Sequence, residues 1–324
     1  MLSHIVHRVL QSFAVLAVMS LLVFAGVYAV GNPMDILVNP QSDQNEIARA
    51  AAALGLDRPL LEQYFIFIRH AAAGDLGRSF AFNVPAIGLI LERMPATLEL
   101  AIAAMLIAVL LGIPLGLWAG LKPRSTAGKT IMAGSILGFS LPTFWVGIML
   151  IMVFSVWLGW LPTSGRGPTV NLIGIPVSFL TLEGLRHLVL PAANLALFNL
   201  SLVIRLTRSG TREAMQQDYV RYARAKGLTE TRIVGVHVLR NVLVPVVTVV
   251  GVEFGSVIAF AVVTESIFAW PGMGKLLIDS INVLDRPVIV GYLCIVVALF
   301  VAINLFVDLL YSWLDPRVRL GEAT

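Results

Sequence analysis

The chain has 324 residues, of which 58% are hydrophobic and only 13% are charged, and its net charge is +4. A chain of this length would ordinarily form two soluble domains, but that apolar fraction and a mean hydropathy of +0.87 exclude this class and indicate a membrane protein. The modest charge argues against nucleic acid as a partner. The single cysteine, Cys294, excludes an internal disulfide and a cysteine metal cluster.

Charge-poor runs long enough to cross a bilayer recur along the chain. A helix needs about 20 apolar residues to span about 30 Å of hydrocarbon. Such runs cover residues 9–30, 98–121, 131–159, 188–206, 241–263 and 288–310. The first run exceeds the core of a signal peptide and is closed by no small-residue cleavage site, so it is predicted to be a transmembrane helix. We therefore expect an all-α membrane protein with six transmembrane helices.

The third run, 131–159, is too long to stand upright in a bilayer. Its segment Ser140-Leu141-Pro142 lacks one backbone donor in the middle of the predicted helix, because proline has no N–H. A tilt or a kink at Pro142 is expected.

The distribution of lysine and arginine predicts the orientation. With the N-terminus inside, the inside segments hold more of these residues than the outside segments, and the acidic residues show the opposite bias. Both termini are then cytoplasmic. The expected domains are 1–30 with the first span, an external loop over 31–95, and a transmembrane domain over 96–324 whose cytoplasmic loop covers 207–240.

The external loop is the only segment between spans that is large enough for structure of its own. An apolar stripe at helical spacing predicts an amphipathic helix that lies on the membrane surface or packs on the bundle. The stripe consists of Leu60, Leu61, Tyr64, Phe65 and Ile68. The glycines of residues 74–80 predict a turn after it.

No catalytic or metal-binding arrangement is recognisable. The histidines are scattered over both sides of the predicted membrane, without a pair at metal-binding spacing. Residues 123–130 read PRSTAGKT and match the end of a phosphate-binding loop, but Pro123 replaces its first glycine and no strand precedes it. We interpret this segment as a basic turn and expect no hydrolysis by the chain alone.

The long cytoplasmic loop contains a short predicted helix. Asp218 can cap its start, Gly227 can end it, and Thr229 can cap the next helix. Tyr219 and Tyr222, with small alanines, give it a thin face that suits a groove on another protein. A solvated basic linker attracted to anionic lipid fits the same residues, so both readings remain open at this point.

This loop resembles the signature of ATP-binding-cassette (ABC) importer permeases. Gly227, Leu239 and Ala223 match that signature. The departures from it are Arg221, Tyr222, His237 and Arg240. These departures are similar to the dipeptide/oligopeptide branch of the family, whose loop resembles the YVRYARAKGL of this chain.

Further segments resemble the same branch in the same order. They are LGLDRPL at 54–60, GDLGRSF at 74–80, ERMPATLELA at 92–101, FSLPTFWVG at 139–147, LGWLPTSGRG at 158–167 and WPGMG at 270–274. Where that branch often has Pro-Gly-Asp-Pro after its first span, this chain has Val-Gly-Asn-Pro at 30–33.

The resemblance implies a type I ABC importer permease in a bacterial inner membrane. Its implied partners are a second homologous permease, two ATPase subunits that bind ATP and magnesium, and an extracytoplasmic substrate-binding protein, while the chain itself holds no cofactor. The implied cargo is dipeptides and oligopeptides, with glutathione, a nickel complex or another small solute as alternatives. The implied ATPase-coupling residues are Asp218, Tyr219, Arg221, Tyr222, Ala223, Arg224, Gly227 and Leu228.

Polar residues inside the spans are candidates for the translocation path, because an ionised group near the bilayer centre costs about 2.5–3.5 kcal/mol. Glu253 either faces the path or the second permease, or makes a structural hydrogen bond. Asp308 and Glu99 lie near span ends, where a structural role is expected. The further path or gate candidates are Pro142, Asn194, Asn199, Trp270 and Pro271.

Each of these candidates also has a structural interpretation. Asn194, Asn199 and Ser201 can hydrogen-bond between helices, which is the commoner use of such residues. Trp270 and Pro271 can be an interfacial anchor with a turn instead of a gate. At the level of the whole chain, the rival functions are an ion-gradient-driven secondary transporter and, more remotely, an intramembrane enzyme.

Overall fold

The computed structural model describes residues 2–30 and 58–314, and these residues are mostly helical. The other described residues form turns and loops, an isolated bridge between Arg78 and Pro85, and a short antiparallel hairpin of β1 (Val170–Leu172) and β2 (Ile175–Val177). The expectation of an all-α membrane protein is thereby confirmed.

Four helical segments within the described residues are long and apolar enough to cross a membrane. They cover residues 86–121, 182–214, 230–267 and 286–307. The first three contain the expected spans 98–121, 188–206 and 241–263, and the fourth covers most of the expected span 288–310. They correspond to α5 (Ala86–Leu121), α8 (Leu182–Ala214), α11 (Leu239–Ile267) with the short helices before it, and α13 (Arg286–Leu314). The first expected span, 9–30, lies in α1 (Leu2–Val30).

The expected third span is broken into two pieces. Helix α6 (Thr126–Ser140) meets α7 (Thr143–Leu150) and the π-helix η1 (Ile151–Trp157) at a bend of 110°. Pro142 has no N–H to continue the helix, and the preceding Leu141 is extended, with φ −80° and ψ 137°. The kink expected at Pro142 is confirmed, and it divides the helix over 131–159 into two pieces.

The helix predicted in the loop is present as α4 (Leu60–Ala72) and packs against α1. The hydroxyls of Tyr64 and Ser20 are 2.9 Å apart, and the rings of Tyr64 and Phe24 are 5.4 Å apart. The glycines at 74 and 77 have positive φ, which confirms the turn. Helix α5 already begins at Ala86, so residues 86–95 of the expected loop are helical.

Helices α5 and α8 pack at very close range through a row of glycines on α5. A Cβ atom at Gly116 would lie 2.6 Å from Cβ of Thr207 and 2.8 Å from the carbonyl oxygen of Ile204. Gly112 and Gly120, one turn to either side, are equally tight against α8. Small residues at this spacing let two membrane helices approach until their backbones touch, so α5 and α8 form a rigid pair.

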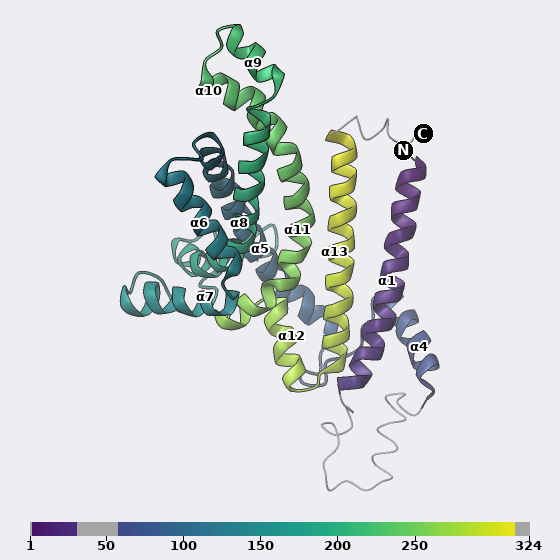
Figure 1. The fold of residues 1–324 in the computed structure, drawn as a ribbon. Coiled ribbons are helices and arrows are strands. Elements are labelled where there is room, and N and C mark those ends of the chain that lie inside the picture. The colour runs from purple at the N-terminus through teal and green to yellow at the C-terminus, as the bar shows by residue number, and fades with distance from the viewer. Residues whose placement is uncertain (1, 31–57, 315–324) are drawn as a thin grey trace.

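The bundle has two distinct ends (Figure 1). Helices α9 (Asp218–Ala225) and α10 (Glu230–Arg232) project beyond the spans at one end, followed by the π-helix η2 (Ile233–Val238) that leads into α11. We call this the α9 end, and α1 begins and α13 finishes there. At the opposite end α12 (Met273–Asn282) joins α11 to α13, and we call it the α12 end.

Candidate functional site

Helix α9 has a well-defined C-terminal cap but no side-chain cap at its N-terminus. Its N-cap residue is Gln217, without a side-chain cap bond, so the expectation that Asp218 caps the helix is wrong. Asp218 lies in the first turn and pairs with Arg221 at 3.4 Å. Gly227 has φ +76° and donates to the Arg224 carbonyl, while Leu228 donates to that of Ala223. This is a Schellman motif, so Gly227 ends α9 as predicted.

One face of α9 is buried against its own chain. Val220 is 0% exposed and Ala223 is 6% exposed. They form the α9 cluster with Ile233, Val238 and Val242 of η2 and α11. Ala223 therefore packs inside this subunit, and its expected place on an outward contact face is wrong. The physical reason is that the short helix has two apolar stripes, of which Val220 and Ala223 take the inner one.

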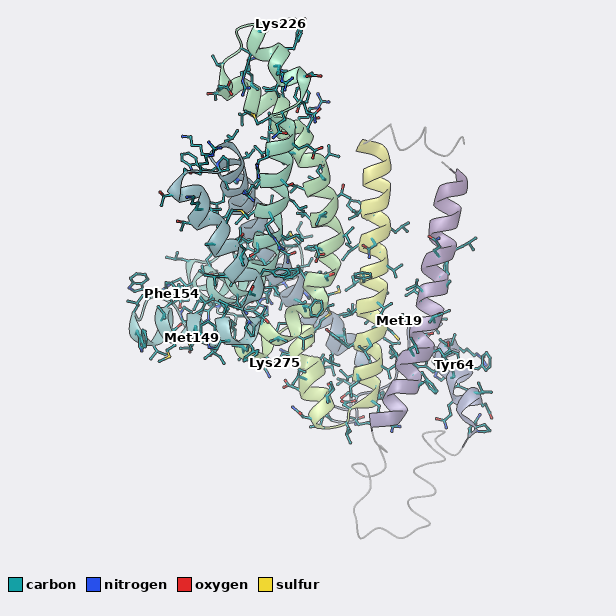
Figure 2. The ribbon with its side chains drawn as sticks, in the orientation of Figure 1. Met19, Tyr64, Met149, Phe154, Lys226 and Lys275 are labelled. Atoms are coloured by element: carbon teal, nitrogen blue, oxygen red, sulfur yellow. The ribbon has the colours of Figure 1, made fainter. Side chains whose placement is uncertain are left out.

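The opposite face of α9 carries the tyrosines. Tyr222 is 63% exposed, and the ammonium of Lys226 lies 4.6 Å from the centre of its ring. Tyr219 is at the edge of this face, where its hydroxyl accepts a hydrogen bond from Asn241 at 3.0 Å. Figure 2 shows Lys226 at the far tip of the α9 end. An aromatic and basic surface thus stands clear of the spans.

A charged pair fixes α9 to α10. Arg224 donates from Nε to one carboxylate oxygen of Glu230 at 2.6 Å and from a terminal nitrogen to the other at 3.2 Å. The side-chain hydrogen bond from Arg224 lowers the pKa of Glu230, and the same bond raises the pKa of Arg224. Thr229 takes the N-cap position of α10 but makes no side-chain cap bond. Arg224 is therefore mainly tied to its own chain.

At the α12 end, a buried glutamate binds the turn after α11. Glu265 is fully buried and accepts a hydrogen bond from the Thr97 hydroxyl at 2.6 Å and one from the Lys275 amide at 2.9 Å. The Thr97 oxygen in turn accepts from the Met273 amide at 2.8 Å. We call this set, which joins α5, α11 and α12, the Glu265 clasp.

Trp270 reinforces the same contact. Its indole N–H donates to the Ala96 carbonyl at 2.9 Å, and the side chain is fully buried. The guanidinium of Arg166 lies 5.9 Å from its ring centre. Trp270 is therefore an internal anchor on α5, and the expectation of an interfacial anchor in contact with lipid is wrong.

A second buried acid holds the hairpin loop. Glu99 of α5 accepts from Arg166 Nε at 2.9 Å, and its other oxygen accepts from the amides of Ser178 and Phe179 and from the Ser178 hydroxyl. Arg166 also donates to the Pro176 carbonyl at 2.6 Å. The structural role expected for Glu99 is confirmed.

A third acid, Asp285, precedes α13 and is fully buried. It accepts hydrogen bonds from the Ser79 hydroxyl and from the amides of Phe80 and Ala81. The turn at 74–80 is thus fixed to the start of α13.

The remaining path candidates are not brought together into one site. Asn194 donates to the Thr264 hydroxyl at 3.0 Å, which is the helix–helix bond considered for it. Asn199 is buried in α8, Pro142 lies at the bend, and Pro271 is half-buried in the α11–α12 turn. Glu253 is half-buried in mid-α11, and no described residue hydrogen-bonds to it.

Sequence reasoning missed the residues of the Glu265 clasp and Asp285. Glu265 lies two residues beyond the expected end of the fifth span at 263, so it was not counted among the acids inside spans. The available signal was its place five residues before Trp270, the first residue of the WPGMG segment.

The fold and these features define a multi-span membrane protein with an exposed helix at one end. Two family models cover most of the chain. The model of the binding-protein-dependent transport system inner membrane component matches residues 112–320, and the model of its N-terminal region matches residues 1–101. The chain therefore belongs to this family and is a multi-pass inner-membrane permease.

Curated relatives match over nearly their whole length. The di/tripeptide transport system permease DppB of Pseudomonas aeruginosa is 40% identical over 98% of this chain and 99% of its own. The dipeptide permease DppB of Escherichia coli K12 is 39% identical over 93% of this chain and 94% of its own. The dipeptide permease of Alkalihalophilus pseudofirmus is 36% identical over 98% of this chain and its full length.

A solved structure supports the fold. The inward-facing MetNI methionine ABC transporter aligns with a TM-score of 0.53 at 14% identity, over 71% of this chain and 97% of the matched chain.

Proposed function

We propose that this chain is the permease subunit of an ATP-driven importer for dipeptides and oligopeptides, and that it forms the translocation path with a second homologous permease. The support is near-full-length similarity to permeases that carry di- and tripeptide names. In this proposal ATP and magnesium are bound by two ATPase subunits, and the cargo is delivered by an extracytoplasmic binding protein.

The observation that carries the proposal is the construction of α9. The helix is held by the α9 cluster and by the Arg224–Glu230 pair, yet its tyrosine face is exposed. A rigid helix with an aromatic face fits a groove on another protein, and large aromatic side chains anchor such contacts. Tyr219, Arg221, Tyr222 and Lys226 would contact the ATPase. Asp218, Ala223, Gly227 and Leu228 would keep the helix in shape.

The proposed topology has six spans and both termini in the cytoplasm. Helices α6, α7 and η1 together provide the third span in this proposal, and α1 provides the first. The beginning of α1 and the finish of α13 at the α9 end support it (Figure 1), as does the excess of lysine and arginine in the segments on that side.

Within the membrane, Glu253 is the proposed polar residue of the path or of the interface between permeases. A half-buried carboxylate in mid-span without a described hydrogen-bond partner needs water or another chain. Trp270 and Pro271 are proposed as part of the external gate, while Pro142, Asn194 and Asn199 are proposed to shape the helices around it.

Uptake by a deletion strain that carries this chain on a plasmid tests the proposal. Import of labelled dipeptides and oligopeptides should depend on the chain and on ATP, and should persist when ion gradients are dissipated. If the deletion strain without the plasmid loses nickel or glutathione uptake but keeps peptide uptake, the alternative cargo would be assigned. Uptake that follows an ion gradient and survives ATP depletion would support a secondary transporter.

A further inference from the structure

The turn after α11 is shaped around the carboxylate of Glu265. A Cβ atom at Gly272 would lie 2.2 Å from a carboxylate oxygen of Glu265, and one at Gly274 would lie 2.6 Å from Cα of Val262. Contacts this short leave no room for any side chain. The two glycines of the WPGMG segment therefore allow the backbone to close on Glu265, so that the Lys275 amide reaches the carboxylate and the Met273 amide reaches Thr97.

A carboxylate is a costly way to fill this position. Burying a charge is unfavourable unless hydrogen bonds replace its water, whereas an apolar side chain of similar size would fill the same space without that cost. The bonds of the Glu265 clasp are directional, however, and they fix the turn at one distance and orientation relative to α5. This geometric precision is what apolar packing alone would not supply.

The clasp closes a ring of packed elements that runs the length of the bundle. From the α9 cluster, α11 leads to Glu265 at the α12 end. The Glu265 clasp connects α11 to Thr97 of α5, and the glycine row of α5 packs along α8. Helix α8 returns to the α9 end, where Ala214 joins the α9 cluster. Figure 1 shows α5, α8 and α11 lying beside one another between the two ends.

We propose that Glu265 and Thr97 are positioning residues of the transport cycle, which hold the α11–α12 turn on α5 so that the two ends of the bundle move together. The inference rests on the proposed function. When the loaded binding protein displaces the α12 end, α5 and α11 shift as one body, and the α9 cluster carries the shift to α9. Without the clasp, the turn moves on its own and the displacement is lost before it reaches α9.

Thr97 offers a matched pair of substitutions. Thr97→Val keeps the shape of the side chain but removes the oxygen that donates to Glu265 and accepts from Met273. Thr97→Ser keeps that oxygen and removes a methyl group. The complete complex, with wild-type partners, is reconstituted in nanodiscs, and ATP hydrolysis is measured alone and with loaded binding protein. Glu265→Gln is a second variant, which replaces one carboxylate oxygen by a donor while keeping the length of the side chain.

The inference predicts separate effects on the two rates. In Thr97→Val and Glu265→Gln the basal rate per assembled complex should stay within about twofold of wild type, while stimulation by the loaded binding protein falls about fivefold or more. Thr97→Ser should respond as wild type does. A purely structural role would instead lower both rates in proportion to the amount of folded complex.

The contradictory results are distinct. Normal stimulation in assembled Thr97→Val and Glu265→Gln complexes, or proportional loss of both rates, would overturn the inference and leave the proposed function intact. A wild-type chain that forms no complex with ATPase subunits, or whose complex does not respond to a loaded binding protein, would overturn the proposed function and the inference with it.

Discussion

Arg166 and Glu99 are 67 residues apart in the sequence and form a buried ion pair, with 9% and 3% of their side chains exposed. The pair joins the hairpin loop to α5 and sits beside the Trp270 ring. The ion pair and its hydrogen bonds thus hold the hairpin loop against α5.

Arg166→Gln should destabilise the permease by about 3–5 kcal/mol, because it leaves the Glu99 carboxylate buried without its cation. Arg58→Gln is the matched control, since Arg58 pairs with Glu62 at 2.7 Å on an exposed surface. Its expected cost is about 0–1 kcal/mol. Thermal unfolding in detergent measures both, and equal costs would contradict the account of the hairpin.

Gly116→Ala should loosen the contact between α5 and α8. The new Cβ would meet Thr207 at 2.6 Å, and overpacking of this kind costs about 1–3 kcal/mol. Gly134→Ala is the control, because nothing lies within 4 Å of a Cβ there. Gly116→Ala alone should lower the melting temperature of the permease. An unchanged melting temperature for Gly116→Ala would contradict the close packing of α5 on α8.

Acid should release α10 from α9. Because the pKa of Glu230 is lowered in the folded chain, the pair stabilises the loop above the ordinary carboxyl pKa of about 4.3 and loses this effect as pH falls through the lowered value. A spin label on Thr231→Cys, in a Cys294→Ser chain, should gain mobility on acidification. In a Glu230→Gln chain the label should be mobile at neutral pH and show no such transition. A label whose mobility is the same after acidification and in the Glu230→Gln chain as in the starting chain at neutral pH would contradict this role of the pair.

Single cysteines should report opposite sides of the membrane. In intact cells carrying a Cys294→Ser chain, Asp279→Cys at the α12 end should react with an impermeant thiol reagent, and Lys226→Cys at the α9 end should not. Permeabilised cells, in which both positions should react, provide the control. Labelling of Lys226→Cys from outside would reverse the proposed orientation.

Hydropathy located four of the expected spans in long apolar helices, because a helix that crosses lipid satisfies its own backbone hydrogen bonds and is built mostly of apolar residues. The sequence also predicted a tilt or a kink at Pro142, since a missing N–H acts locally. The size of that break was not predictable, because 110° depends on what α7 packs against. The early start of α5 at Ala86 was missed because the charges of Glu92 and Arg93 interrupt the apolar run that marks the span.

The site was predictable only in part. Gly227 marked the end of α9 because a left-handed residue is needed there. Which side of α9 faces inward was not evident, since Ala223 and Tyr222 are both compatible with contact in so short a helix. The Glu265 clasp depends on a contact between residues 168 positions apart, and no local pattern announces it.

The central claim, that α9 docks on an ATPase through its tyrosine face, is tested most directly at Tyr222. Tyr222→Glu places a charge on the exposed face and leaves the α9 cluster intact, whereas Tyr222→Phe keeps the ring. The decisive measurement is the amount of ATPase that co-purifies with equal amounts of folded permease. The account predicts that Tyr222→Glu loses about tenfold or more of the bound ATPase, as expected for an aromatic anchor worth 1.4 kcal/mol or more, and that Tyr222→Phe keeps it. Wild-type recovery of ATPase by the Tyr222→Glu permease would contradict the claim.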